Sequence, residues 1–372
     1  MIRTVPLRVL AVSLCVGVLV IAGSLLSHDG DITGLIKFGD TPEAQLVAQH
    51  AGNEIGREVI TVGEGHDGMY FFLQALDPLL LSPGDHAALL DRPVYRGQRM
   101  LFPLVAGFGG FVPGPALPWT MAFTNLFAIA LGTAATSRLA RRLGGSEWWG
   151  LAFALNVGVI FEFDISGAGI LAFAAALWGT VALEERDDRR AAVWFTVAVL
   201  AREVMFLYLA GALLLRLFRT RRIPWLIGIP PTVAALSWAI YLRARLTEGA
   251  GVDEVQEFGL PFRGMVRAFE NWIENPVDLA VIAALVAITP MLVVRALRQP
   301  TYLSWGSLGF VVLAVFFSRQ VWWRFFDISR AIAPVITAYL LATFATGGDT
   351  TEADIDGLNA PSDTSPAADA MV

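Results

Sequence analysis

Long apolar stretches without charge constrain this chain more than any other feature of its sequence. The first, Val9–Ser27, follows Arg8 and contains no charged residue. A run of ~20 apolar residues is long enough to cross a bilayer as a helix. Only 16% of the 372 residues are charged and 55% are hydrophobic, whereas a soluble chain is about 25% charged. This composition argues against a soluble enzyme, a disordered scaffold or a disulfide-rich secreted domain.

Ten segments have the apolar character of membrane helices. They are Val9–Ser27, Pro118–Leu139, Trp148–Phe161, Ala168–Leu183, Ala191–Ala201, Val204–Leu217, Pro224–Leu242, Val277–Val294, Tyr302–Phe317 and Ile328–Phe344. The first is long for a cleaved signal peptide, so we expect an uncleaved signal anchor, with cleavage as the alternative. Met100–Phe111 is shorter and is either interfacial or re-entrant. The fold class predicted is an all-α polytopic membrane protein with about ten transmembrane helices and a long first outer loop bearing short amphipathic helices.

Arginine-rich loops set the predicted orientation. Ten crossings place most of them on one side and the loop 27–99 on the other. Because cytoplasmic loops are enriched in Arg and Lys, we expect a multi-pass protein of the plasma membrane, with both termini cytoplasmic and the loop 27–99 extracytoplasmic. The segment 347–372 has six acids and no base, which predicts a disordered cytoplasmic tail after one membrane domain, 1–346. No basic footprint for nucleic acid is present.

The loop 27–99 contains all four histidines and a distinctive segment around Asp67. If Asp67 opens a helix, Tyr70 and Gln74 follow on the same face. Asp67 is then either a helix cap or an acid/base carboxylate at the membrane surface. His66 beside it makes both residues weak candidates for binding a metal. A divalent cation such as Mg or Mn is therefore compatible with the sequence and not required by it.

Several arginines stand where a phosphate or another anion is a suitable partner. Arg96 and Arg99, with Tyr95 beside them, precede an apolar stretch and share a helix face. Arginine matches phosphate oxygens with a planar fork of donors; anchoring to lipid headgroups is the alternative. Arg324 and Arg330 lie near the outer ends of the last two spans, where the orientation rule does not favour arginine.

Two further segments combine charge with apolar surroundings. Arg202 and Glu203 interrupt two apolar runs, and ionisable groups at membrane depth are functional by default. Neighbouring helical residues point apart, so we expect different partners for the two; a structural clamp between helices is the alternative. Arg263 stands in a turn that opens an amphipathic helix through Trp272.

Taken together, these motifs resemble the C-type (GT-C) glycosyltransferases. The shared pattern includes G-x-D-G-x-Y-[FY] around Asp67 and D-x-P-x-Y-R-x-x-R-[IM]-L-[FY]-P-L from Asp91 to Leu104. The Arg202–Glu203 pair, the turn at Arg263 and Ser329–Arg330 also fit. The layout extends over most of residues 1–344, and the nearest likeness is to bacterial and archaeal membrane proteins of cell-surface glycopolymer formation. His66 departs from the pattern, which usually has an aromatic residue there.

The resemblance implies an inverting transfer of sugar from a polyprenyl (dolichyl) phosphate donor to an acceptor hydroxyl at the outer membrane face. It makes Asp67 the catalytic base, and the acceptor is a glycan, a lipid or a protein. The implied substrate- and phosphate-binding residues are Tyr70, Gln74, Tyr95, Arg96, Arg99, Arg202, Glu203, Arg263, Arg324 and Arg330. A flippase or transporter of a lipid-linked sugar and a non-catalytic accessory protein are the alternatives.

Overall fold

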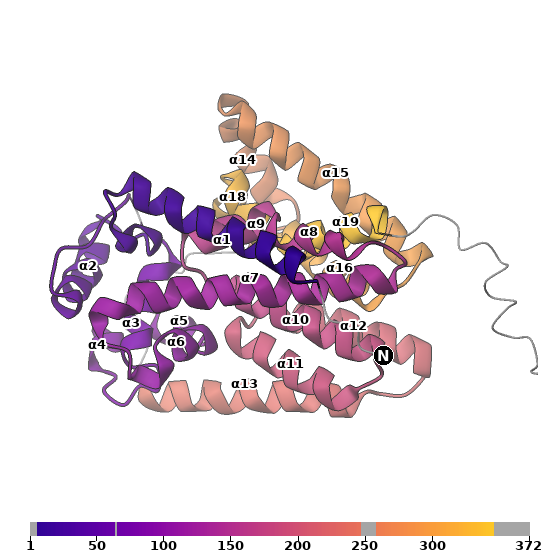
Figure 1. Cartoon of the computed structure of the whole chain (residues 1–372), viewed down its shortest axis with the longest axis horizontal. Helices are drawn as coiled ribbons and strands as arrows, with labels where there is room; N and C mark the ends of the chain where they lie inside the picture. The colour runs from indigo at the N-terminus through magenta and orange to yellow at the C-terminus, as the bar shows by residue number, and fades with distance from the viewer. Residues whose placement is uncertain (1–5, 64, 247–257, 346–372) are drawn as a thin grey trace, which may run out of the picture.

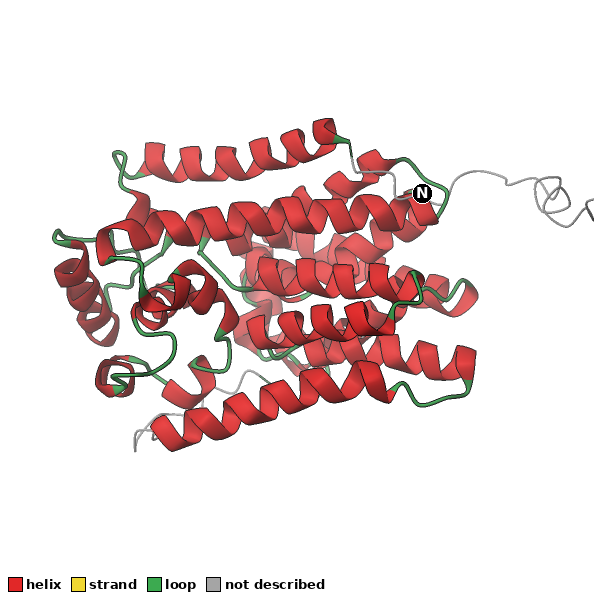
Figure 2. Ribbon diagram, turned by 60° about the horizontal axis from the view of Figure 1, so that its bottom comes forward, coloured by secondary structure: helices red, strands yellow, loops and turns green. Residues whose placement is uncertain are grey.

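The computed structural model describes residues 6–63, 65–246 and 258–345, and within these ranges it is all-α. Figure 2 shows helices joined by loops, without a strand in the described ranges. The expected all-α fold class is thus confirmed, while the predicted tail 347–372 lies outside the described residues.

Four helices are long and apolar enough to cross a membrane. They are α1 (Leu7–Ser27), α7 (Leu117–Arg142), α13 (Trp225–Arg245) and α15 (Pro276–Arg298). A fifth span is counted if α18 (Phe325–Ala331) and α19 (Ala333–Phe344), which meet at a 73° bend, are taken together. The protein therefore has several apolar helices of spanning length, as a multi-pass membrane protein requires.

The expectation of about ten spans is wrong, because the other apolar segments form helices that are too short or are interrupted. The short helices are α10 (Gly169–Glu184), α11 (Asp188–Ala201), α12 (Met205–Thr220) and α16 (Tyr302–Phe316). The segment predicted at 148–161 is divided among η4 (Glu147–Gly150), α8 (Leu151–Ala154) and α9 (Val157–Asp164). Asn156 separates the last two helices, and its side-chain oxygen accepts the Gly158 N–H at 2.9 Å.

The short helix α10 forms the centre of the bundle and packs against α7 and α11 (Figure 1). Fourteen of its sixteen residues are buried, and many of them are alanine. Small side chains let helix backbones approach closely, and α10 accordingly has neighbours on nearly every side. By contrast, only about a fifth of the residues in the most apolar stretch of α13 and of α15 are buried. Most of the apolar surface of these two helices therefore faces outward, as in lipid-facing helices.

A layer of short helices covers one end of the bundle (Figure 1). This short-helix layer comprises η1 (Ile32–Leu35), α2 (Pro42–Ile55), α3 (Asp67–Leu76), α4 (Gly84–Leu89), α5 (Pro93–Arg96), α6 (Leu101–Ala106), η2 (Phe108–Gly110) and η3 (Gly114–Ala116). α6 and η2 occupy most of the segment predicted as interfacial or re-entrant. α6 packs on α3 and α7 with Phe102 fully buried. The chain resumes at Phe258 and forms α14 (Arg263–Glu274), the expected amphipathic helix, and later α17 (Arg319–Trp322).

The opposite end of the bundle gathers the arginine-rich helix ends. Arg142 at the end of α7 donates to the Glu184 carbonyl at 3.1 Å. Arg216 near the end of α12 pairs with Asp188 at the start of α11 at 3.0 Å. Arg295 near the end of α15 donates to the Ala342 carbonyl of α19 at 2.7 Å. These contacts join the ends of six helices in three pairs, away from the short-helix layer.

Candidate active site

Close backbone packing fixes the position of Asp67 at the first turn of α3. His66 is the cap residue, and its backbone N–H donates to the Lys37 carbonyl at 2.9 Å. A Cβ on Gly68 would overlap the carbonyl oxygens of Ile36 and Ile165, so only glycine lets α3 begin this close to both segments. Asp67 therefore occupies the first helical turn and not the capping position, and its carboxylate points into the interior of the molecule.

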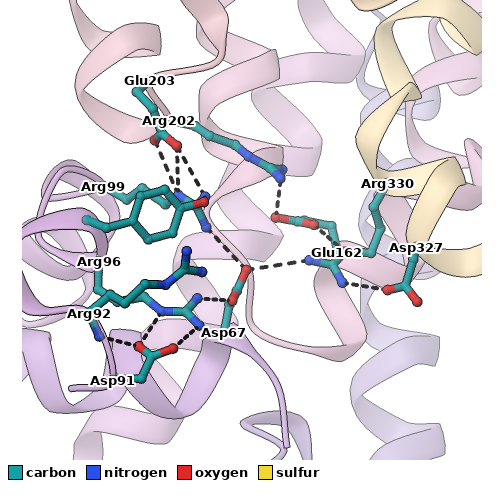
Figure 3. Close-up of polar contacts among 11 residues, drawn as sticks. Asp67, Asp91, Arg92, Arg96, Arg99, Glu162, Arg202, Glu203, Asp327 and Arg330 are labelled. Atoms are coloured by element: carbon teal, nitrogen blue, oxygen red, sulfur yellow. Dashed lines mark hydrogen bonds and ion pairs between the residues drawn. The ribbon is translucent and has the colours of Figure 1, made fainter. Parts of the chain in front are cut away.

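Three arginines converge on the Asp67 carboxylate (Figure 3). Arg96 Nη1 lies 2.5 Å from Oδ1, and Arg99 Nη1 lies 3.3 Å from Oδ2. Arg330 Nη2, from the end of α18, lies 3.7 Å from Oδ2. About a quarter of the Asp67 side chain is exposed. Because two of the arginines belong to the short-helix layer and the third to α18, Asp67 joins the layer to the helix bundle.

Aromatic rings and a second carboxylate hold Arg96 and Arg99 in place. Arg96 also contacts both oxygens of Asp91 at 2.9 Å and lies 4.3 Å from the ring centre of Tyr70. Arg99 donates to the Tyr95 hydroxyl at 2.7 Å and is buried. These guanidinium groups are thus oriented before any substrate arrives, which reduces the entropy lost when they bind an anion.

Two acids that the sequence analysis did not select complete the network on the bundle side. Glu162, at the end of α9, contacts Arg330 at 2.7 Å and Arg202 at 3.4 Å. Asp327 contacts Arg330 at 3.4 Å. Both acids stand between predicted spans, in segments expected to be aqueous turns. Acids are common in such turns, so neither residue was selected as a site candidate. For Glu162, the signal available was an acid within an otherwise apolar stretch, since such a group needs a cationic partner.

Arg202 and Glu203 have different partners, as their adjacency predicted. Arg202 pairs with Glu162, whereas Glu203 contacts Arg99 at 3.2 Å. We call the connected set the arginine–carboxylate network. It consists of Asp67, Asp91, Glu162, Glu203, Asp327, Arg96, Arg99, Arg202 and Arg330. Arg92 adjoins the network: its backbone N–H donates to Asp91 Oδ1, and its guanidinium lies over the Tyr95 ring (Figure 3).

The network determines the charge state of Asp67. Burial by itself raises the pKa of the Asp67 carboxyl, but the charges of the network arginines outweigh burial and hold that pKa well below its ordinary value. Asp67 is therefore ionised at neutral pH. Burial and then the charge of Arg330 lower the pKa of His66, so its imidazole is neutral there. Burial, followed by the charge of Asp91, raises the pKa of Tyr70 to about 12.

Tyr70 and Tyr95 contact arginines of the network, whereas three other predicted binding residues lie away from it. Gln74 is buried two turns further along α3, in a small pocket with His86 between α3, α4 and α13. Arg263 begins α14. Arg324 contacts Asp278 of α15 at 3.0 Å and lies over the Phe326 ring. The structure thus brings together Asp67, Tyr70, Tyr95, Arg96, Arg99, Arg202, Glu203 and Arg330 and separates them from these three.

The network offers little to a metal ion. Among the described residues, no group of three or more His, Cys, Asp or Glu side chains is arranged to hold one. Asp67, one of the two weak metal candidates, faces three arginines, and their positive charge opposes a divalent cation beside it. The residues here do not fit a Mg or Mn site, whereas guanidinium groups suit an anion.

Comparisons of this chain with known protein families, with curated proteins and with solved structures find no match.

Proposed function

We propose that this protein is an inverting glycosyltransferase that moves a sugar from a polyprenyl phosphate to an acceptor hydroxyl at the extracytoplasmic membrane face. The observation that carries the proposal is the convergence of three arginines on an ionised, partly exposed Asp67 beside apolar helices of spanning length. Such a site places a proton acceptor, the Asp67 carboxylate, within hydrogen-bonding distance of arginine N–H groups that can bind an anion.

The arginines supply the electrostatic part of the reaction. In our proposal the donor phosphate binds to free N–H groups of Arg96, Arg99 and Arg330, each of which has five donors. Guanidinium groups oriented by carboxylates and rings are pre-organised for the negative charge that develops on the leaving phosphate. The same arrangement selects an anionic lipid over a neutral one.

The donor tail needs an apolar surface that opens to the bilayer. A groove of about 600 Å³ lies between α12 and α13 and is lined almost wholly by apolar side chains, among them Leu213, Leu217, Ile229 and Val233. α12 begins two residues after Glu203 of the network. The groove is lined by the second half of α12 and the start of α13, toward the arginine-rich end, so a donor tail whose phosphate is held at the network would run along α12 to reach it.

Asp67 takes the proton of the acceptor in this mechanism. The acceptor oxygen forms a bond to the anomeric carbon, and its proton passes to the Asp67 carboxylate. The bond between the anomeric carbon and the phosphate oxygen breaks, and its electron pair leaves with the polyprenyl phosphate. Attack from the side opposite the leaving group inverts the anomeric centre.

The ion pairs also imply an order of binding. While three arginines contact Asp67, its lowered pKa makes it a weak base. A phosphate that draws these guanidinium groups toward itself reduces their hold on Asp67 and raises its basicity. Donor binding therefore precedes productive binding of the acceptor.

The orientation follows from the charge distribution. The arginine-rich helix ends lie at one end of the bundle and the network at the other. Because arginine-rich ends favour the cytoplasm, we place the network on the extracytoplasmic side of the plasma membrane, with the acceptor a glycan, a lipid or a protein of the cell surface.

The test uses purified full-length protein in lipid with a panel of radiolabelled polyprenyl-phosphate sugars. We expect wild type to release sugar to acceptor or water, and Asp67→Asn to lose about 10²–10⁴-fold, the usual contribution of a positioned base. The variant should fold, because Arg96, Arg99 and Arg330 keep Asp91, Glu203 and Glu162 as partners. Asp85→Asn, an exposed acid of the same layer, is the matched control.

Full activity of Asp67→Asn would remove Asp67 as the base. Equal donor binding by both proteins without any transfer would instead support a flippase, and donor translocation in sealed vesicles would then be measured.

A further inference from the structure

Helix α14 divides its surface into three faces. Gly264, Ala268 and Trp272 form a buried face along one side. Phe262, Val266, Phe269 and Ile273 form an apolar stripe on a second side, and their side chains are 54%, 68%, 49% and 61% exposed. The third side is charged and exposed, and it contains Arg263, Arg267, Glu270 and Glu274. A helix of a soluble protein normally presents only the first and third kinds of surface.

The buried face attaches α14 firmly to the segment around α17. Trp272 Nε1 donates to the Trp322 carbonyl at 2.8 Å, and Asn271 Nδ2 donates to the Trp323 carbonyl at 2.6 Å. A Cβ on Gly264 would overlap the Phe317 carbonyl oxygen. Since these contacts fix the rotation of α14 about its axis, the apolar stripe stays exposed in the folded protein.

The stripe lies beside an exposed apolar surface on α15. α15 starts two residues after α14 ends and is one of the four helices of spanning length. Val277, Leu279 and Val286 on α15 are 61%, 39% and 41% exposed, so exposed apolar side chains continue from α14 onto α15. With twelve residues, α14 itself is ~18 Å long and cannot cross a hydrocarbon core of ~30 Å.

We propose that α14 is an interfacial helix, with its apolar stripe in the headgroup–acyl boundary of the bilayer that α15 crosses and its charged side in water. A helix with a lipid side and a water side next to each other, and a third side against protein, fits that boundary. Arg263 and Arg267 stand on the charged side, within reach of lipid phosphates. The occupant of the stripe is therefore phospholipid and not a partner protein.

This position has a consequence for the arginine–carboxylate network. α14 holds the backbone of Trp322 and Trp323, and α18 begins two residues later and carries Arg330. The bilayer surface, through α14, thereby fixes the level of Arg330 relative to the lipid headgroups. The inference does not depend on the proposed transferase activity, because it concerns only where the helix lies.

Spin labels on single cysteines test the proposal. Cys15→Ala provides the background, and labels are placed by Val266→Cys, Phe269→Cys and Ile273→Cys on the stripe and by Arg267→Cys, Glu270→Cys and Glu274→Cys on the charged side. Asp85→Cys in the short-helix layer is the water reference, and Leu236→Cys on the exposed side of α13 is the lipid reference. Collision rates with oxygen, which concentrates in lipid, and with a polar nickel complex are measured in nanodiscs.

We expect a several-fold higher oxygen-to-nickel ratio at each stripe position than at each charged-side position, with stripe values near that of Leu236→Cys. Stripe labels as accessible to nickel as Asp85→Cys would overturn the proposal. Stripe labels shielded from both reagents would overturn it too, because a protein surface or a second copy would then cover the stripe.

Discussion

Arg96 contacts two carboxylates at once, and both belong to the short-helix layer. Its Nη1 faces Asp67, while Nε and Nη2 face Asp91. The planar fork makes this possible, and a lysine ammonium with its single nitrogen cannot reproduce it. The geometry around Asp67 thus depends on the shape of the arginine as well as on its charge.

Replacing Arg96 by lysine keeps the charge and removes the fork. We expect Arg96→Lys to lower kcat/KM of sugar transfer by about 10–100-fold, because a charge-assisted contact contributes about 1.5–3 kcal/mol. Steady-state kinetics on the purified protein measures this. Arg57→Lys, in the exposed pair with Asp31 away from the network, should leave kcat/KM unchanged; an unchanged value for Arg96→Lys as well would show that charge alone suffices.

His66 gives stability a pH dependence. Its folded-state pKa lies below 6.5, mainly through burial, so the unfolded chain takes up the proton first as the pH falls. The contribution of neutral His66 to the free energy of unfolding is complete above pH 6.5. This contribution is lost as the pH falls toward the lowered pKa of His66 in the folded protein. We expect His66→Gln to flatten the decline of Tm in that window, measured by thermal unfolding at about pH 5 to 8. His86, whose pKa is lowered in the same sense by burial, contributes to the decline in the same direction, and an identical decline in His66→Gln would contradict this account.

At the scale of elements, one carboxylate ties α15 to the bent pair α18 and α19. Asp278 is 1% exposed, accepts the Phe325 N–H at 2.8 Å and contacts Arg324 at 3.0 Å. It thereby caps the first turn of α18, the helix that ends at Arg330 and Ala331. The role of Arg324, expected to bind substrate, is in this structure to hold two helices together.

Removal of that carboxylate should loosen α18. We expect Asp278→Ala to lower the free energy of unfolding by about 1–3 kcal/mol, since Phe325 loses its acceptor and Arg324 its counter-ion. Asp278→Asn keeps an acceptor oxygen and should lose less. Chemical denaturation in detergent compares the two variants, and equal losses would mean that the ion pair with Arg324, and not the cap, carries the effect.

At the scale of the whole molecule, the two ends of the bundle should lie on opposite sides of the membrane. In a Cys15→Ala background we expect Asp85→Cys to react with an impermeant maleimide added to intact cells. Arg189→Cys, at an exposed position in the first turn of α11, should react only after the membrane is opened. Reaction of both positions in intact cells would exclude the proposed orientation.

Composition and charge were enough to predict an all-α membrane protein and its four long helices, but not the number of spans. α10 is apolar all round because protein surrounds it, and hydropathy does not distinguish a protein-enclosed helix from a lipid-facing one. The three-residue spacing likewise predicted that Arg96 and Arg99 lie on the same side of their segment. It did not reveal that Arg330 meets Asp67 from 263 positions away, because that contact depends on the bend between α18 and α19.

Unequal helix lengths determine how deep the network lies. α10, α11, α12 and α19 contain 16, 14, 16 and 12 residues, which corresponds to ~18–24 Å against a hydrocarbon core of ~30 Å. α7 and α13 extend past them toward the short-helix layer (Figure 1). The arginines and acids stand where the shorter helices stop, so they lie short of the ends of α7 and α13. In the proposed reaction, the polyprenyl phosphate would then meet the arginines below the outer ends of the longest helices, within the outer part of the membrane's thickness.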